Sequence, residues 1–252
     1  MIDSFGLRKS LKVSTLSVIL GANLGITALS PQAFAGTTPV SSVGSGVAFT
    51  CNDTEATIKA KQGPTVTIGA THIYIGYQQV SSNNKDPRII RFDNGVKKWC
   101  RTDYETTNDD GTGYGLLWDG SGVLYGVFSS TGTQTGNDFR RFATKGWLPT
   151  YGSGGGAKIA VLAQINPING DVNSATFLSA ILSSGKSNSL TVTGLSWNGT
   201  NLTVKADSAW SPRSPNTKPM TCVAGSPSPF KYTAVFTGDL SKVNSTSAPG
   251  CS

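Results

Sequence analysis

Turn-forming residues divide most of this chain into short runs of β-branched and aromatic residues, and this pattern restricts the fold more than any other feature. Asp93-Asn94-Gly95 and Asn198-Gly199 are typical of tight hairpin turns, and strong helix formers such as Glu and Met are rare. The pattern therefore predicts an all-β chain of short antiparallel meanders. The expected strands are Thr65–Ile68, Thr71–Tyr77, Arg88–Phe92, Val96–Cys100, Gly115–Trp118, Val123–Phe128, Lys158–Ile165, Ala175–Leu178, Leu190–Trp197, Leu202–Ala206 and Phe230–Leu240.

These runs group into three blade-like units, Thr65–Glu105, Gly113–Leu178 and Leu190–Leu240. One hairpin string occurs twice, because GLLWDGS at residues 115–121 aligns with GLSWNGT at residues 194–200, 79 positions later. Self-similarity of this kind is typical of repeat architectures, in which one unit buries its apolar face against its neighbour. We therefore expect residues 47–252 to form a single all-β repeat domain.

The repeated strings resemble a known family. Residues 113–125 (GYGLLWDGSGVLY) are similar to the hairpin of bacterial β-propeller repeats of the SBBP type, and residues 158–178 (KIAVLAQINPINGDVNSATFL) to the segment that follows it. The resemblance covers roughly residues 111–210 and implies a β-propeller-like arrangement. Because closed propellers usually have four to eight blades, three units leave three possibilities open: an additional blade in the weakly patterned ends, an open stack or sandwich, or chains that pair to complete a ring. The repeat is structural, so it implies no catalytic residue.

The N-terminus predicts export. Arg8, Lys9 and Lys12 precede an apolar stretch, and Ala33-Phe34-Ala35 supplies small residues for cleavage, so residues 1–35 are expected to be a signal peptide. Residues 36–46, mostly Gly, Ser and Thr, are expected to be a flexible leader. No later apolar run is long enough to cross a bilayer, which predicts no membrane span after cleavage and a periplasmic or extracellular location.

Four cysteines follow the predicted cleavage site, namely Cys51, Cys100, Cys222 and Cys251. An even number in an exported chain favours disulfides, and four cysteines allow three pairings. We expect the sequential pairing, Cys51–Cys100 and Cys222–Cys251, because the second bridge would hold the C-terminal end on the body. With no Cys-x-x-Cys spacing and a single histidine, His72, the sequence predicts no metal site and no cofactor.

Charge argues against a nucleic-acid partner. The net charge of +7 falls to +5 after cleavage, because residues 1–35 hold three basic residues and one acidic residue. The remaining basic residues form only short clusters, at Lys97-Lys98, Arg101 and Arg140-Arg141, whereas nucleic-acid binders carry a dense basic patch or stripe.

The sequence gives little support for catalysis. His72 would be the base of any histidine-dependent triad, and no Gly-x-Ser-x-Gly nucleophile motif occurs. Glu105 with an aspartate could supply a glycosidase carboxylate pair, but the turn signal at residues 108–111 (NDDG) directly after it predicts the solvated end of a strand. We therefore predict no catalytic residues, with a secreted carbohydrate-active enzyme as the alternative.

Aromatic rings beside guanidinium groups are the best ligand-binding candidates, since together they could hold a sugar ring; the competing interpretation is that they pack the core. The loop from Ser208 to Phe230, with five prolines, is a second candidate. The sequence thus predicts an exported, non-catalytic binding or structural module for a glycan or a cell-surface protein. A subunit of a surface assembly, and hence a homo-oligomer, is a further alternative. The candidate ligand-binding residues are Trp99, Arg101, Trp147, Trp210 and Arg213.

Overall fold

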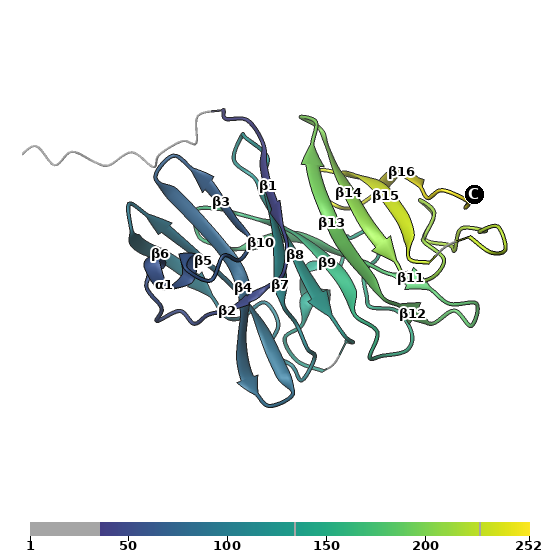
Figure 1. The fold of residues 1–252 in the computed structure, drawn as a ribbon, viewed down its shortest axis with the longest axis horizontal. Helices are drawn as coiled ribbons and strands as arrows, with labels where there is room; N and C mark the ends of the chain where they lie inside the picture. The colour runs from purple at the N-terminus through teal and green to yellow at the C-terminus, as the bar shows by residue number, and fades with distance from the viewer. Residues whose placement is uncertain (1–35, 134, 227) are drawn as a thin grey trace, which may run out of the picture. The chain divides into compact units, whose positions relative to one another are not determined.

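The computed structural model describes residues 36–133, 135–226 and 228–252 (Figure 1). The predicted signal peptide, residues 1–35, lies outside the described residues. The predicted all-β class is confirmed, since three large sheets and one two-stranded sheet hold the strands, and none closes into a barrel. The described helices are α1 (Glu55–Lys59) and the 3-10 helix η1 (Phe139–Phe142), and neither is long and apolar enough to span a membrane.

The first large sheet, here the N-terminal sheet, has the strand order β2-β4-β5-β6, with β3 also paired to β4. All its pairings are antiparallel except that of β2 with β4. Asn94 and Gly95 adopt positive φ angles of 51° and 78°, as expected for the predicted hairpin turn. The strands are β2 (Val47–Ala48), β3 (Thr65–Ile68), β4 (Thr71–Ser81), β5 (Asn84–Asp93) and β6 (Val96–Arg101).

The second sheet, the central sheet, has the order β1-β7-β8-β9-β10, and every neighbouring pair in it is antiparallel. Four of its strands correspond to predicted ones, whereas β1 lies in a segment for which no strand was expected. The strands are β1 (Val40–Val43), β7 (Gly113–Trp118), β8 (Leu124–Ser130), β9 (Ile159–Ile165) and β10 (Val172–Leu178).

Within residues 36–46, for which the sequence predicts a flexible leader, Val40–Val43 form the strand β1. Val40 to Val43 pair with Trp118 to Gly115 on β7, and the Trp118 indole nitrogen donates to Thr37 Oγ1 at 2.8 Å. The small residues of this segment are needed for close approach, because a Cβ on Gly46 would lie 2.6 Å from the carbonyl oxygen of Gly113. Small size here serves strand packing and does not indicate disorder.

The third sheet, the C-terminal sheet, is an antiparallel meander in the order β13-β14-β15-β16. A two-stranded hairpin, β11 (Ala180–Ile181) with β12 (Ser187–Asn188), precedes it. The strands are β13 (Leu190–Trp197), β14 (Asn201–Ser208), β15 (Phe230–Thr237) and β16 (Val243–Ser247).

The central sheet is buried on both faces. Tyr125 and Val127 of β8 belong to the core shared with the C-terminal sheet, whereas Leu124 and Phe128 of the same strand belong to the core shared with the N-terminal sheet. This alternation follows from the period of two in a strand. All seven residues of β8 are buried, which explains why the predicted strands of the middle unit read as nearly continuous apolar runs.

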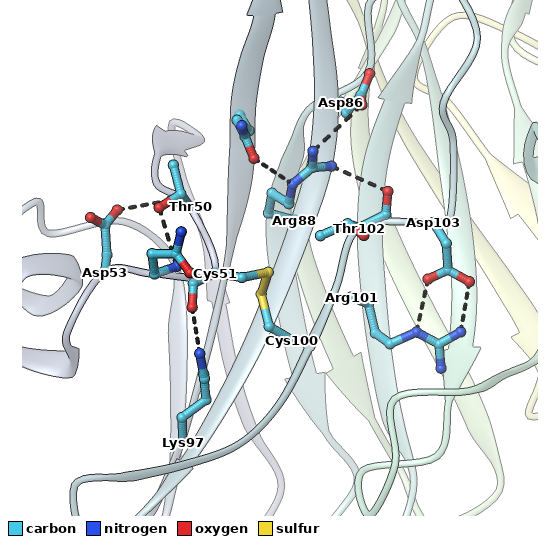
Figure 2. The surroundings of a disulfide bond; sticks show 12 residues. Thr50, Cys51, Asp53, Asp86, Arg88, Lys97, Cys100, Arg101, Thr102 and Asp103 are labelled. Atoms are coloured by element: carbon cyan, nitrogen blue, oxygen red, sulfur yellow. Dashed lines mark hydrogen bonds and ion pairs between the residues drawn. A yellow bond between two sulfur atoms is a disulfide. The ribbon is translucent and has the colours of Figure 1, made fainter.

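Both predicted disulfides are confirmed. Cys51–Cys100 joins the segment before α1 to β6, and Lys97 Nζ on the same strand donates to the Cys51 carbonyl at 2.6 Å (Figure 2). Cys222–Cys251 joins the loop between β14 and β15 to the C-terminal end. Thr221 and Ser252 beside this bridge exchange two backbone hydrogen bonds of 2.8 and 2.9 Å, so the last residues are held in place as expected.

Candidate functional site

Two of the predicted ligand-binding residues, Trp99 and Arg101, contact the turn between β9 and β10. The Trp99 indole nitrogen donates to the carbonyl oxygen of Pro167 at 3.0 Å, and Arg101 donates to the Asn169 carbonyl at 3.4 Å and pairs with Asp171. The hydroxyl of Tyr104 donates to the Gly170 carbonyl in the same turn. These side chains therefore attach the central sheet to the N-terminal sheet.

Arg101 has further partners within its own segment. Its Nε and Nη2 donate to the two oxygens of Asp103 at 2.8 and 2.9 Å, as Figure 2 shows, and its guanidinium lies 5.5 Å from the centre of the Tyr104 ring. These hydrogen bonds raise the pKa of Arg101 and lower that of Asp103. A guanidinium paired in this way has little capacity left for an external anion.

Trp147 and Arg213 hold the loop between β14 and β15. Trp147 is 8% exposed, packs edge-on against Phe236 and donates its indole hydrogen to the Pro215 carbonyl at 2.7 Å. Arg213 is 6% exposed and donates to the Thr217 carbonyl at 2.7 Å and to Ser179 Oγ at 3.1 Å. Hydrogen bonds from Trp147 and Arg213, two of the predicted ligand-binding residues, thus hold the predicted binding loop Ser208–Phe230 in place.

Trp210 differs from the other four candidates because 46% of its surface is exposed. The structure therefore does not bring the five residues together into one site. Trp99 and Arg101 contact one turn, Trp147 and Arg213 hold a second segment, and Trp210 alone presents much of its ring to the surface.

The carboxylate considered for catalysis, Glu105, is buried. It is 1% exposed, and its Oε1 accepts from the backbone N–H and the hydroxyl of Thr107 at 2.5 and 2.6 Å. Its Oε2 has no hydrogen-bond partner among the described residues. Burial raises the pKa of Glu105 to about 8, and neighbouring Asp109, which is also buried, has a raised pKa for the same reason.

The solvated turn expected after Glu105 is only partly solvated, because Thr106 and Asn108 are exposed whereas Asp109 is buried. Asp109 accepts from Ser130 Oγ at 2.7 Å and from the backbone N–H of Thr131 at 2.6 Å. A Cβ added to Gly111 would lie 3.1 Å from Glu105 Oε2, so the backbone itself covers this oxygen. The carboxylates of Glu105 and Asp109 therefore accept hydrogen bonds inside a buried connecting segment and do not face an open cleft.

His72 and the acidic residues form no recognisable metal or triad site in the described part of the chain. The His72 imidazole pairs with the Glu55 carboxylate, which also accepts from the Tyr74 hydroxyl at 3.1 Å. No group of three His, Cys, Asp or Glu side chains that could hold a metal ion occurs in residues 36–133, 135–226 and 228–252.

β1 and β13 lie side by side (Figure 1), with Cα atoms of the two strands within 8 Å of each other. Two cavities form a groove between them that the sequence analysis did not predict. One end is a cavity of about 460 Å³, with Val43, Ser45, Tyr114, Lys158 and Val192 among its walls. The other end is a cavity of about 260 Å³ between Thr38–Ser41 and Leu195–Trp197. We call the two cavities together the β1–β13 groove.

Each wall of the β1–β13 groove is the terminal strand of its sheet. Near one end, the backbone N–H groups of β13 are occupied, since Leu190 donates to the Lys158 carbonyl at 3.1 Å and Val192 to the Tyr114 hydroxyl at 3.2 Å. At the other end, Asn198 N–H donates to the Asn201 carbonyl at 3.3 Å, so these two residues form a hydrogen-bonded pair beside the turn. Bonded and non-bonded pairs then alternate along β13 and β14 from this pair. The alternation of an antiparallel ladder then turns the backbone groups of Leu195 and Trp197 away from β14, toward the open edge.

The sequence carries one signal that could have revealed this groove. Residues 36–52 and 187–204, which include β1 and β13, contain no charged residue. Edge strands are commonly protected by charged side chains, so two uncharged stretches at free edges are unusual.

Comparison of the chain with protein-family models, with curated proteins and with solved structures finds no match to any of them.

Proposed function

We propose that this protein is an exported, non-catalytic binding module that holds an extended polypeptide in the β1–β13 groove. The observation that carries the proposal is the smaller cavity of the groove, where Leu195 and Trp197 of the terminal strand β13 form one wall. A short extended segment held in this cavity can form main-chain hydrogen bonds with β13, and the cavities can take its side chains.

A polypeptide fits this groove better than a glycan does. Sugar rings are commonly held on exposed aromatic faces, whereas Trp99 and Trp147 donate to carbonyls of their own chain. Strand edges offer alternating donors and acceptors, which match another backbone. The two cavities, of about 460 and 260 Å³, provide room for side chains at separate positions along the same edge.

Export is part of the same proposal. Two disulfides in the described residues fit an oxidising compartment, either the periplasm or the cell exterior. On the basis of the resemblance to SBBP-type repeats, we also propose that the three large sheets are blade-like units in an open stack. In such a stack the terminal strands of neighbouring sheets stay available for contacts.

The second candidate function is a secreted carbohydrate-active enzyme, favoured by the raised pKa of Glu105, since a carboxylic acid that stays protonated near neutral pH can act as a general acid. The burial of Glu105 speaks against it, because the side chain cannot reach a substrate from its position. A panel of polysaccharides incubated with the protein tests this candidate. Cleavage by the wild type that disappears in Glu105→Gln would replace the binding proposal with the enzymatic one.

The binding proposal is tested with short random peptides displayed on phage and, in parallel, with an array of neutral and acidic glycans. Ser45 is exposed and lines the larger cavity, so Ser45→Trp should fill the groove without disturbing the core. Ser241→Trp, at an exposed turn position, is the matched control. We expect peptides whose affinity falls at least about tenfold in Ser45→Trp and stays unchanged in Ser241→Trp. Binding of glycans alone, or peptide binding that Ser45→Trp leaves intact, would contradict the proposal.

A further inference from the structure

We infer that the larger cavity of the β1–β13 groove binds the C-terminal carboxylate of a polypeptide, with the apolar side chain of its last residue against Val43 and Val192. The inference rests on the proposed function and names the chemistry of the ligand. Only the final residue has to enter this cavity, whose volume of about 460 Å³ lies within the range of about 300–1,000 Å³ that is usual for ligand sites. The residues before it lie toward the smaller cavity.

Two hydroxyls in the wall of the larger cavity leave one hydrogen without an acceptor. Thr112 Oγ1 and Ser129 Oγ lie 2.8 Å apart, and Ser129 Oγ also accepts from the Thr112 backbone N–H at 3.0 Å. Two hydroxyls carry two hydrogens, and the bond between them uses one. The remaining hydrogen has no acceptor in the described part of the chain, and Ser129 is only 2% exposed. A ligand oxygen in the cavity would accept this hydrogen.

Tyr114 supplies a second hydroxyl donor to the same cavity. Its oxygen accepts from the backbone N–H of Val192 at 3.2 Å, whereas its hydrogen has no acceptor among the residues that the structure describes. Burial raises the pKa of Tyr114, so the hydroxyl keeps its hydrogen at neutral pH. The cavity therefore offers hydroxyl hydrogens from two places in its wall.

Lys158 adds a positive charge, and no other charged residue of the described chain lines either cavity. Its ammonium lies 3.8 Å from Asp110 Oδ2, which is longer than the distance of about 2.7–2.9 Å for a charge-assisted hydrogen bond. Half of the Lys158 side chain is exposed, and an ammonium has three donor hydrogens, so it can bind a second carboxylate. An ammonium beside two hydroxyl donors favours an anionic ligand group.

The edge of β13 favours a chain terminus over an acidic side chain within a sequence. The N–H groups of Leu190 and Val192 are already occupied, so a backbone that follows β13 from Trp197 loses its hydrogen-bonding partners at the larger cavity. A chain that runs in this direction is antiparallel to β13 and arrives with its C-terminus. The opposite direction would bring an N-terminal ammonium to Lys158, and two like charges repel each other.

The side chain of the last residue meets an apolar part of the cavity wall. Val43, Leu190 and Val192 line the same cavity as Lys158. Removing an apolar side chain from water against such a wall favours binding. We therefore expect peptides that bind to end in Val, Leu, Ile or Phe with a free carboxylate.

The test compares chemical forms of one peptide. A random library is displayed on phage with free C-termini, and the best binder is synthesised as the free acid, as the C-terminal amide and as the free acid extended by Gly-Ser-Gly. We expect the amide and the extended form to bind at least about tenfold more weakly than the free acid.

Two variants at the cavity should have opposite effects. Lys158→Gln should abolish the difference between acid and amide, whereas Lys242→Gln, at an exposed lysine outside both cavities, should retain it. Asp110→Asn should strengthen binding of the free acid by about threefold, because it removes the carboxylate that competes for Lys158.

Equal affinity of the acid and the amide would overturn the inference, and so would a Lys158→Gln variant that weakens both forms alike. If both forms bind equally and Ser45→Trp abolishes the binding of each, the proposed function stands and only the terminal carboxylate fails. Libraries that yield no binder, whether their C-termini are free or fused to the coat protein, would contradict the proposed function itself.

Discussion

The indole nitrogen of Trp99 donates a 3.0 Å hydrogen bond to the carbonyl oxygen of Pro167, which lies 68 positions later in the turn between β9 and β10. The same carbonyl accepts from Nη1 of Arg91 at 2.7 Å. A tryptophan that the sequence offers as a platform for sugar rings thus joins two sheets. Trp147 likewise donates its indole hydrogen to the Pro215 carbonyl, whereas Trp210 keeps 46% of its surface exposed.

Replacing Trp99 with Phe should destabilise the fold without altering binding. The substitution removes one donor to Pro167, while Arg91 still satisfies the carbonyl, so we expect a loss of about 1 kcal/mol in the free energy of unfolding. Trp210→Phe, at the exposed tryptophan, should change it by less than about 0.5 kcal/mol. Urea denaturation of both variants makes the comparison. An unchanged midpoint for Trp99→Phe together with lost glycan binding would show that Trp99 serves a ligand.

Glu105→Gln should become more stable than the wild type as the pH rises. The pKa of Glu105 is raised from its usual 4.5 to about 8, so the folded chain keeps a proton that the unfolded chain loses in this window. The stability that this proton contributes is complete below about pH 4.5 and is lost as the pH rises toward 8. Because one pKa unit corresponds to about 1.4 kcal/mol, the variant should gain about 2–4 kcal/mol on the wild type between pH 5 and 8.

Thermal unfolding of both proteins at several pH values measures this difference. The other titratable groups are common to the two proteins and cancel in the comparison. Parallel curves for wild type and Glu105→Gln across the window would mean that Glu105 is ionised in the folded protein, contrary to its burial.

Removing the bridge between Cys222 and Cys251 with a double serine variant should cost about 3–4 kcal/mol, since it frees a loop with a sequence separation of 29 residues. The loss should appear in chemical denaturation as a lower midpoint with a similar slope. Binding through the β1–β13 groove should persist under conditions where the variant is folded, because neither cysteine lines that groove. A variant as stable as the wild type would show that the loop is held by Trp147 and Arg213 alone.

Gly46→Ala should release β1 from the central sheet. The added Cβ would lie 2.6 Å from the Gly113 carbonyl oxygen, whereas at Gly44, two residues earlier, the nearest atom would be a side-chain carbon of Pro64 at 3.9 Å. We expect Gly46→Ala to cost about 1–3 kcal/mol and to speed amide exchange in residues 40–43, with Gly44→Ala close to the wild type. Equal exchange in the two variants would contradict the close approach of β1 to β7.

Local patterns predict most strands of this protein but not their stacking. The expected strands, such as Thr65–Ile68 and Leu190–Trp197, form because turn residues and β-branched runs act over a few residues. β1 escaped prediction because its small polar residues have no apolar alternation, and its pairing depends on β7, some 75 residues away. The resemblance to propeller repeats likewise concerns individual hairpins, so it does not predict how the sheets stack on one another.

The site was harder to predict than the fold. A turn signal at residues 108–111 suggests solvent, yet packing between two sheets buries Asp109 and Glu105. The sequence shows that Trp99 and Arg101 are close in the chain, but the carbonyls that they bind belong to a turn about 70 residues later. Which strands lie at the edge of a sheet depends on the order of strands in the folded sheet, and the sequence does not show this order. The absence of charge in residues 187–204 was therefore the only sequence signal for the groove.

Amide hydrogen exchange across β13 tests the central claim most directly, with the protein alone and then saturated with a phage-selected peptide. The account predicts that the amides of Leu195 and Trp197 exchange quickly in the free protein and slow at least about tenfold on saturation, while the already bonded amide of Val192 changes little. Unchanged exchange at Leu195 and Trp197, with protection appearing instead around Trp210, would place the binding surface elsewhere and contradict the account.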